Sequence, residues 1–481
     1  MSRAHPAGPK HGDLIGPSPL PAIPGPAAEL TAGVWPVGAD RDQTGTLCIS
    51  GVPVTEVAER FGTPVLVMDA DDLRTRARDY VRAFTDPSGR AEVTIYYAGK
   101  AFLAAAVVRW LRDEGLGMDV CSGGELACVL AAGMPANRVL FHGNNKSAAE
   151  LRTALGAGVG RIVVDSHDEL DRLAAIAHDE GVRAPVLIRV TLGVEAHTHE
   201  FIATAHEDQK FGFSLASGSA SRAVRRAAHH PDLELIGVHS HIGSQIFVAS
   251  GFEVAAQRAV GFLADLRAMD GIEIGELNLG GGMGIRYTEA DEPLDIATMG
   301  PALLQTVVAE CDRRGVPVPR LAFEPGRAIV GPSTVTVYEV GTVKRRSLDG
   351  GRKRTYISVD GGMSDNIRTA LYDADYTVTL ANRIAPAAPE LSRVVGKHCE
   401  SGDIVIRDAW LPGDVVPGDL LAVAATGAYN RSMASNYNMV GRPPVVAVDG
   451  GRLRTVLRRE TLTDMFLLDP GLTEPPITPT P

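Results

Sequence analysis

The sequence predicts an α/β chain in which a (β/α)8 TIM-like barrel is followed by an all-β carboxyl-terminal domain, a β-barrel or sandwich. Two observations predict this. Short β-prone runs alternate with helical patterns eight times over about 230 residues, the size and rhythm of such a barrel. Beyond Arg327 the strands follow one another without helices between them. A doubly wound open sheet is the alternative, although six or fewer strands would be more usual for it.

The chain is expected to divide into five segments. Residues 1–28, rich in proline, glycine and alanine, form a flexible arm, and 29–62 add to the β domain. The barrel covers 63–330 and the β domain 331–469. The tail, 470–481, is too rich in proline for a helix or a central strand.

The barrel segment opens with a short strand at Pro64–Met68 and a helix that begins at Asp71 and Asp72, acidic residues that suit a helix amino terminus. Eight strands follow near Val93–Tyr97, Gly117–Val120, Val139–His142, Arg161–Val164, Val186–Val190, Leu235–His239, Glu276–Leu279 and Leu321–Phe323. Helices are expected at Leu103–Arg112, Gly124–Ala132, Ala148–Leu155, Asp168–Ala177, Ala220–Ala228, Phe252–Met269 and Ala302–Arg313.

The β domain is expected to contain closely spaced strands. They lie at Thr334–Val343, Arg354–Val359, Tyr376–Leu380, Ile404–Arg407, Leu420–Ala425, Pro444–Val448 and Arg452–Arg458. The run Gly45–Ile49 is a candidate for one more.

Composition excludes several classes of function. The net charge of -11 argues against nucleic acid as a partner, because phosphate backbones call for a basic face. No apolar run approaches the roughly 20 residues that a membrane-spanning helix needs. The five cysteines are odd in number and contain no CxxC pair, so neither a disulfide framework nor a zinc site is indicated. A reducing, cytoplasmic setting fits best.

Unusual residues gather where the barrel strands end, which is where barrel enzymes carry their chemistry. Lys100 follows the first strand, Asp119–Glu125 the second and His142–Lys146 the third. His239–Ser244 follows the sixth strand. The seventh ends in Gly280, Gly281 and Gly282, and the eighth in Glu324, Pro325, Gly326 and Arg327. A lone lysine is more often a surface residue, but the other motifs at the strand ends favour a functional lysine here.

Together these residues indicate pyridoxal phosphate (PLP), which needs a lysine for its aldehyde, a phosphate cradle and a partner for its ring nitrogen. Lys100 is the Schiff-base lysine. The triple glycine lets backbone N–H groups close on a phosphate, and Ser244 can add a hydroxyl. Glu324 can keep the ring nitrogen protonated, so that the ring accepts the electrons left by loss of CO2. Tight turns also use glycine freely, so the triple glycine alone is a weak signal.

Other residues are candidates with plainer alternatives. His241 could lie flat on the cofactor ring, and Arg327 offers a planar donor fork for a carboxylate or phosphate, although a surface ion pair with Glu324 is the plain alternative. His197 and His199 invite a metal interpretation, but without a clear further ligand they are better read as polar loop residues, and no metal is expected.

The β domain offers a second group. Arg368 and Tyr372 are four residues apart, so a helical turn would place both on one face. Cys399 lies beside Glu400, which makes a polar site more plausible than a buried thiol. Tyr429 ends another strand.

These motifs closely resemble the diaminopimelate decarboxylases, PLP enzymes that combine an alanine-racemase-like barrel with a β domain. The resemblance runs from about Thr63 to Asp464. It is carried by Tyr-Ala-Gly-Lys-Ala-Phe, Asp-Val-Cys-Ser-Gly-Gly-Glu-Leu, His-Gly-Asn-Asn-Lys-Ser, His-Ser-His-Ile-Gly-Ser-Gln, Asn-Leu-Gly-Gly-Gly, Glu-Pro-Gly-Arg, Cys-Glu-Ser-Gly-Asp and Gly-Ala-Tyr. The stretch Glu195–Phe213 also resembles this family's loop after the fifth strand.

The resemblance implies roles for individual residues. Lys100 would hold the cofactor, His241 would stack on its ring, and Tyr429 would touch it. Cys399 would protonate the carbanion. The residues that would grip the substrate are Arg327, Arg368, Tyr372, Glu400 and Tyr429.

The implied reaction is decarboxylation of meso-2,6-diaminopimelate to L-lysine and CO2 by a homodimer with shared active sites. Two alternatives remain: a sister decarboxylase for ornithine, arginine or a carrier-bound amino acid, and a catalytically inactive regulator. The sequence departs from the family in its long amino-terminal arm, in Gly99, and in Asn430 and Arg431.

Overall fold

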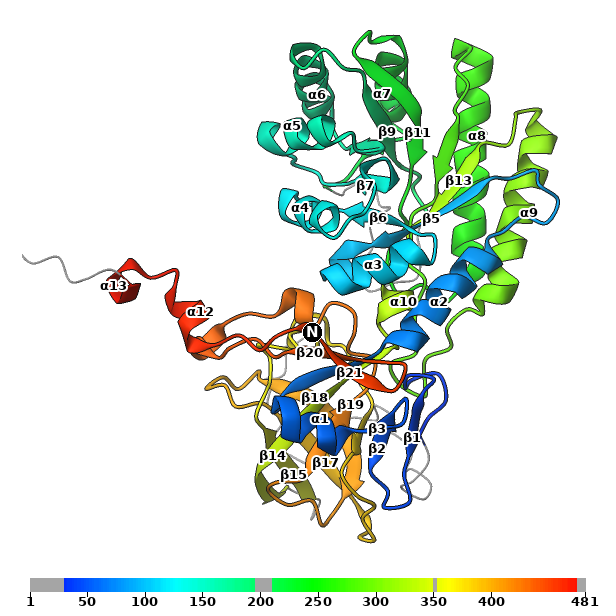
Figure 1. Cartoon of the computed structure of the whole chain (residues 1–481). Coiled ribbons are helices and arrows are strands. Elements are labelled where there is room, and N and C mark those ends of the chain that lie inside the picture. Colours follow the sequence, from blue (N-terminus) through cyan, green and yellow to red (C-terminus); the bar gives the residue numbers. More distant parts are fainter. Residues whose placement is uncertain (1–29, 195–209, 349–352, 474–481) are drawn as a thin grey trace, which may run out of the picture. The chain divides into compact units, whose positions relative to one another are not determined.

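A computed structural model describes residues 30–194, 210–348 and 353–473 of the chain (Figure 1). These residues form two units. The barrel unit contains the described residues of 74–285 and 292–330, and the β unit contains those up to 73, those of 286–291 and those from 331 on. His197 and His199 lie outside the described residues, as does most of the loop expected after the fifth barrel strand.

Eight parallel strands close the barrel within the described chain, because β9 pairs with β8 on one side and β11 on the other. The predicted (β/α)8 fold is therefore confirmed. The strands are β5 (Val93–Ala98), β6 (Gly117–Val120), β7 (Val139–Phe141), β8 (Arg161–Val164), β9 (Ala184–Thr191), β11 (Leu233–His239), β12 (Glu276–Asn278) and β13 (Arg320–Phe323). The short strand β10 (Phe213–Ser214) also pairs with β9.

The barrel interior is filled by side chains rather than open. Tyr96, Leu140, Val163, Leu187 and Ala322 come from five of the strands and form one buried cluster. Burying apolar area here stabilises the closed sheet and leaves the strand ends as the place for chemistry.

Helices lie outside the barrel strands (Figure 1). Several begin at a serine whose hydroxyl accepts a backbone N–H of the first turn: Ser122, Ser147 and Ser166. The helices are α2 (Ala70–Ala83), α3 (Ala105–Asp113), α4 (Gly123–Ala131), α5 (Ala148–Ala157), α6 (His167–Asp179), α7 (Ser219–His229), α8 (Ala249–Asp270), α9 (Ile296–Arg314) and the short α10 (Arg327–Val330).

The β unit is built around one mainly antiparallel sheet. Its longest strand, β14 (Thr334–Ser347), pairs with β4 (Val65–Asp69), β15 (Lys353–Val359) and β19 (Leu420–Val423). The same sheet also contains β16 (Val378–Leu380), β17 (Pro389–Val395), β18 (Ile404–Pro412), β20 (Val445–Asp449) and β21 (Arg452–Leu457). A separate three-stranded sheet is formed by β1 (Ala39–Arg41), β2 (Leu47–Ile49) and β3 (Val52–Pro53). The helices of this unit are α1 (Val54–Phe61), α11 (Arg368–Tyr372), α12 (Leu462–Phe466) and α13 (Pro470–Thr473).

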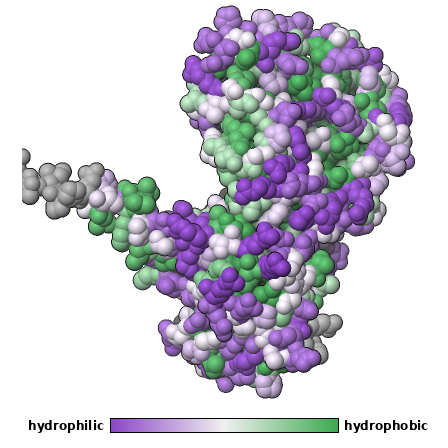
Figure 2. Space-filling model, in the orientation of Figure 1, coloured by the Kyte–Doolittle hydropathy of each residue, from purple (hydrophilic) through white to green (hydrophobic). Residues whose placement is uncertain are grey.

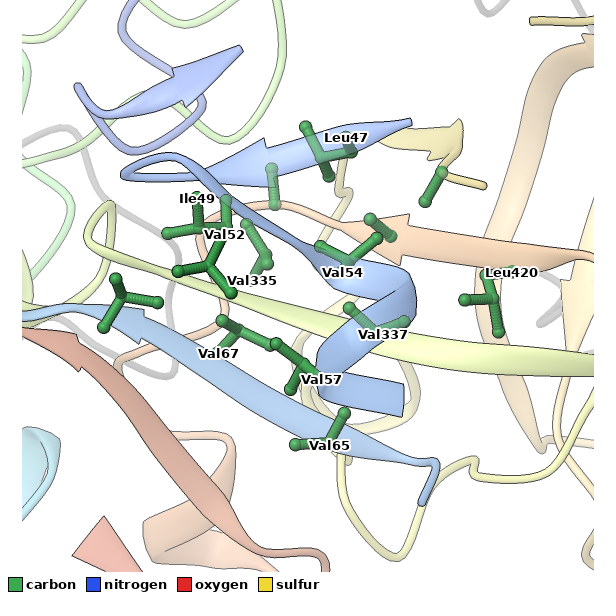
Figure 3. Close-up of a cluster of buried hydrophobic side chains, with 14 of the residues drawn as sticks. Leu47, Ile49, Val52, Val54, Val57, Val65, Val67, Val335, Val337 and Leu420 are labelled. Atoms are coloured by element: carbon green, nitrogen blue, oxygen red, sulfur yellow. The ribbon is translucent and has the colours of Figure 1, made fainter. Parts of the chain in front are cut away.

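Strand β4 lies in the β unit, although the sequence led us to expect it at the start of the barrel segment. It pairs antiparallel to β14 and parallel to β20. Figure 3 shows Val65 and Val67 packed with Val57 of α1 and Val337 of β14 in one buried cluster. The cause is packing, because the alternating valines of β4 fit the apolar face of this sheet and the other eight strands already close the barrel.

Strand β17 and the carboxyl-terminal tail also differ from expectation. Strand β17 was not expected, because its Glu390, Ser392 and Arg393 hide the apolar alternation. The tail begins with the short helix α13, whose proline occupies the first position, where a missing N–H costs nothing. Exposed leucines in α12, in α13 and between them give the end of the described chain an apolar surface (Figure 2). None of the described helices is long and apolar enough to span a membrane.

Candidate active site

Lys100 follows β5 directly, in a short 3-10 turn of residues Gly99–Ala101. The Tyr97 hydroxyl, which is buried, donates to the Phe102 carbonyl over 2.8 Å and fixes the two sides of this turn. A Cβ at Gly99 would lie 2.9 Å from the Asp119 carbonyl oxygen, so the small residue before the lysine lets β5 approach the end of β6. The Lys100 side chain is exposed at the strand end.

Glu324 follows β13 and is buried with three polar partners. Its Oε1 lies 3.0 Å from His142 Nε2 and accepts from Asn278 Nδ2 over 2.8 Å. Its Oε2 lies 3.3 Å from His239 Nε2. Burial alone would raise the pKa of Glu324, but the two histidines hold that pKa well below its ordinary value. The carboxylate is thus kept ionised where the barrel strands end.

Asp119 and His239 extend this buried group. Asp119 Oδ1 lies 3.7 Å from His142 Nε2, and burial raises the pKa of Asp119 to about 6 against the opposing effect of His142. Burial lowers the pKa of His239 and favours its neutral ring. The ligand atoms of His142, His239 and Glu324 lie within 4.8 Å of one another, a geometry that could also hold a metal ion.

Gly280, Gly281 and Gly282 follow β12 and lie where three loops converge. Gly280 and Gly282 have φ of 70° and 107°, which favours glycine. A Cβ at Gly281 would overlap the Glu324 carbonyl oxygen, and one at Gly282 would overlap that of Gly243. The Asn278 side chain accepts the Gly280 N–H over 2.8 Å while donating to Glu324, so it ties this turn to the carboxylate.

Ser244 and Arg327 meet in the barrel unit. Arg327 Nη2 donates to Ser244 Oγ over 3.0 Å, and the guanidinium is buried. A Cβ at Gly326 would lie 2.8 Å from that of Ala98, so this glycine lets the Glu-Pro-Gly-Arg turn approach β5. A cation, a hydroxyl and a glycine turn are the groups that bind a phosphate or carboxylate.

His241 follows β11 and is half-buried. A Cβ at Gly280 would lie 2.9 Å from its Nδ1, and the Gly281 N–H donates to that atom over 3.3 Å. Burial, followed by the charges of Lys100 and Arg189, lowers the pKa of His241 well below its ordinary value. Its ring is therefore neutral and can stack on an aromatic group.

The barrel residues fit PLP. Lys100 offers an amine for the aldehyde, and Glu324 offers an ionised carboxylate for the ring nitrogen. The glycine turn, in which any Cβ would collide with a neighbouring loop, leaves only backbone at the place expected for the phosphate.

The β unit brings together Arg368 and three tyrosine-containing segments. Arg368 is buried at the start of α11, and its Nη1 donates to Tyr376 Oη over 2.5 Å. Its guanidinium carbon lies 4.8 Å from the centre of the Tyr287 ring. The Tyr376 hydroxyl also donates to Asn430 Oδ1 over 3.2 Å, next to Tyr429, whose φ is 63°. Tyr372 is half-buried at the other end of α11.

Cys399 and Glu400 lie in the loop between β17 and β18, and both side chains are exposed. Glu400 Oε1 accepts the Gly402 N–H over 3.1 Å. Its neighbour His398 is buried. The loop therefore presents a thiol and a carboxylate side by side.

Several polar residues of the barrel were not assigned a role from the sequence. Asp119, His142 and His239 were recognised only as unusual residues at strand ends, and Asn278 and Arg189 were not singled out. Their common signal is a polar side chain at the carboxyl end of an otherwise apolar barrel strand.

Comparisons with known proteins define the class. Residues 70–331 match the family model described as the pyridoxal-binding domain of the pyridoxal-dependent decarboxylases. The chain belongs to this class of decarboxylase.

Its relatives define the family further. Diaminopimelate decarboxylase from Mycobacterium tuberculosis (strain ATCC 25618 / H37Rv) is 54% identical over 444 residues, which cover 92% of this chain and 98% of that protein. The Bacillus subtilis (strain 168) protein of the same name is 46% identical over 429 residues, or 89% and 96% of the two chains. Within the class, the chain belongs to the diaminopimelate decarboxylases, carboxy-lyases that use PLP.

A solved structure supports the same family. Diaminopimelate decarboxylase from M. jannaschii, crystallised with L-lysine, superposes with a TM-score of 0.84 at 32% identity, covering 90% of this chain and 98% of that one. The comparisons confirm the family, cofactor and reaction expected from the sequence. The individual site residues stay predictions.

Proposed function

We propose that the chain decarboxylates meso-2,6-diaminopimelate at its D-centre and releases L-lysine and CO2. The observation that carries the chemical part of the proposal is the buried Glu324 carboxylate, which contacts His142, His239 and Asn278. Lys100 follows the first strand of the same barrel. When bound, PLP supplies an electron sink for the electron pair left by loss of CO2.

The barrel residues have separate tasks in this proposal. Lys100 would hold the cofactor through its aldehyde, the group for which the substrate amine would compete. Glu324 holds a proton at the ring nitrogen, because an ionised carboxylate favours the charged form of its partner. The neutral His241 ring stacks on the cofactor, and Gly280–Gly282 with Ser244 bind its phosphate.

The β-unit residues bind and protonate the substrate. The end of diaminopimelate that does not react carries both an amine and a carboxylate, so recognition needs an acid and a cation. Glu400 binds the amine and Arg368 the carboxylate, and fixing this remote end orients the reacting end. The substrate is bound further by Arg327, Tyr372 and Tyr429. Cys399 then delivers a proton to the carbon that lost CO2.

Two chains form a homodimer with two shared active sites in this proposal, in a reducing, cytoplasmic setting. The support is the family resemblance of the Cys399–Glu400 loop. Mixing the variants Lys100→Ala and Cys399→Ser tests it, because half of the random dimers would hold one intact site. Recovery of about a quarter of wild-type activity is expected. If the chains are dissociated and reassembled and no activity is recovered, the proposal of shared active sites is contradicted.

A substrate comparison tests the reaction. The purified holoenzyme is incubated with meso-diaminopimelate, L-ornithine and L-arginine, and CO2 release is measured for each. The proposal expects rapid release from meso-diaminopimelate alone, and loss of that preference in Arg368→Lys. Faster release from ornithine or arginine would favour a sister decarboxylase, and a colourless protein without turnover would favour a regulator.

A further inference from the structure

Asp403 is a buried carboxylate that none of the roles above uses, and it joins two loops of the β unit. Its Oδ1 accepts the Met363 N–H over 2.6 Å, and its Oδ2 accepts the His398 N–H over 2.8 Å. One loop, Gly361–Asn366, leads into α11 and Arg368. The other, Gly396–Asp403, carries Cys399 and Glu400. One side chain therefore connects the loop that carries Cys399 and Glu400 with the loop that leads to Arg368.

The backbone of Asp403 also closes the loop that contains Cys399. Its N–H donates to the Glu400 carbonyl over 3.1 Å, and its carbonyl accepts the Gly396 N–H over 3.0 Å. The turn around Cys399 and Glu400 is thus fixed by Asp403 at both backbone and side-chain level.

Two glycines make room for this carboxylate. A Cβ at Gly362 would lie 2.5 Å from Asp403 Oδ1, and one at Gly396 would overlap Oδ2. Gly362 has a φ of 152°, which other residues rarely adopt. The chain approaches the Asp403 carboxylate from both loops at a distance that only glycine permits.

Further contacts join the same two loops. The Lys397 N–H donates to the Gly361 carbonyl over 3.0 Å, and His398 Nε2 lies 2.8 Å from Ser364 Oγ. All of these contacts lie within the β unit, and the carboxylate of Asp403 accepts a backbone N–H from each of the two loops.

We propose that Asp403 is a positioning residue for the reaction, because it ties the loop of Cys399 and Glu400 to the loop that leads to Arg368. The inference rests on the roles proposed for Cys399, Glu400 and Arg368. A misplacement of catalytic groups by about 1 Å can cost 100-fold in rate. Loosening this connection should therefore lower kcat even when the protein still folds.

The test compares Asp403→Asn with a matched control, Asp419→Asn. Asparagine keeps the size but replaces one acceptor oxygen by a donor that faces an N–H group. Asp419 is also buried and accepts a backbone N–H, that of Val416, over 2.9 Å, but it pairs with Arg383 and joins neither loop. The measurements are kcat and KM for meso-diaminopimelate, the visible absorbance of the cofactor, the melting temperature, and alkylation of Cys399 by iodoacetamide followed by peptide mass analysis.

Asp403→Asn should lower kcat by about 10- to 100-fold, at unchanged cofactor absorbance. Cys399 should be alkylated several times faster than in the wild type, while Cys128 in α4 reacts at the same rate. Asp419→Asn should change the melting temperature and leave kcat and the Cys399 rate as they were. A folded Asp403→Asn with kcat and Cys399 alkylation within twofold of the wild type would overturn the inference, as would equal effects of the two variants.

Ser364→Ala carries the test if Asp403→Asn is insoluble, since it removes only the hydroxyl that contacts His398. It should lower kcat and speed alkylation of Cys399 in the same sense, and an unchanged kcat and rate would overturn the inference. Cys399→Ser and Glu400→Gln separate this inference from the proposed function. If both keep wild-type kcat/KM, the proposed roles fail; if both lose it and Asp403→Asn does not, only the role of Asp403 fails.

Discussion

The Nε2 atom of His142 lies 3.0 Å from Oε1 of Glu324, and both side chains are buried. The same oxygen accepts from Asn278. Donors of this kind stabilise the carboxylate form over the protonated form, so a buried acid remains ionised. In the proposed function, the protonation of the cofactor ring would depend on residues 142 and 324, which come together only when the barrel closes.

Replacing Glu324 by glutamine tests the need for a negative charge. The amide has nearly the same shape but cannot favour a proton on the ring nitrogen. We expect Glu324→Gln to bind PLP, judged by its visible absorbance, and to lose about 100-fold or more in kcat. A variant with normal absorbance and normal kcat would show that the carboxylate does not act on the ring.

Removing His142 should move the pH profile. His142 helps to lower the pKa of Glu324, so the pKa rises in His142→Ala and the carboxylate is lost at a higher pH as the solution is acidified. The acid limb of kcat/KM against pH should shift to higher pH. His229→Ala, on the exposed surface of α7, is the control and should leave the limb in place. An unshifted limb in His142→Ala would contradict this role.

Arg368→Lys tests the grip on the distal carboxylate. The guanidinium is planar, lies against the Tyr287 ring and donates to Tyr376, and a lysine ammonium reproduces none of this geometry. Losing a charged hydrogen bond costs about 1.5–3 kcal/mol, or roughly 10- to 150-fold in kcat/KM. Steady-state kinetics should show most of the change in KM. A loss confined to kcat would assign Arg368 to the chemical step instead.

Asp365 should make the stability of the protein depend on pH. Burial raises the pKa of Asp365 to about 7, although Tyr338 donates to it and opposes the rise. Between pH 4 and 7 the folded state holds a proton that the unfolded chain releases, so stability falls as pH rises. Between pH 5 and 8 the loss is on the order of 3 kcal/mol.

Urea unfolding at pH 5 and pH 8 measures this effect. Asparagine mimics the protonated acid, so Asp365→Asn should match the wild type at pH 5 and exceed it at pH 8. The control is Asp373→Asn, at an exposed position. Equal pH dependence in the wild type and Asp365→Asn would rule out titration of this carboxyl.

The sequence was enough to predict the fold, and it singled out residues that the structure places after the barrel strands, because strand ends in a (β/α)8 barrel share one face. Lys100, Gly280–Gly282 and Glu324 could be assigned to one chemistry before any contact was known. The partners of Glu324 were harder, since His142 is 182 residues away and no local pattern links the two. Asp403 was visible only as the last residue of the Cys-Glu-Ser-Gly-Asp motif. Its contacts could not be predicted, because they are with backbone N–H groups that every residue except proline has.

Strand β4 marks another limit of the sequence. Its alternating valines predict a strand, but periodicity does not say which sheet it joins. That choice depends on the apolar face of β14, more than 260 residues later. Strand β17 was missed for the opposite reason, because its polar residues interrupt the alternation.

The identity of the amine that holds the cofactor is the claim on which the rest depends. Borohydride reduction of the holoenzyme, proteolysis and peptide mass analysis would locate a stable pyridoxyl group. We predict this group on the peptide that contains Lys100, and its absence from Lys100→Ala. A pyridoxyl group on the buried Lys146, on any other lysine, or on none would contradict the account.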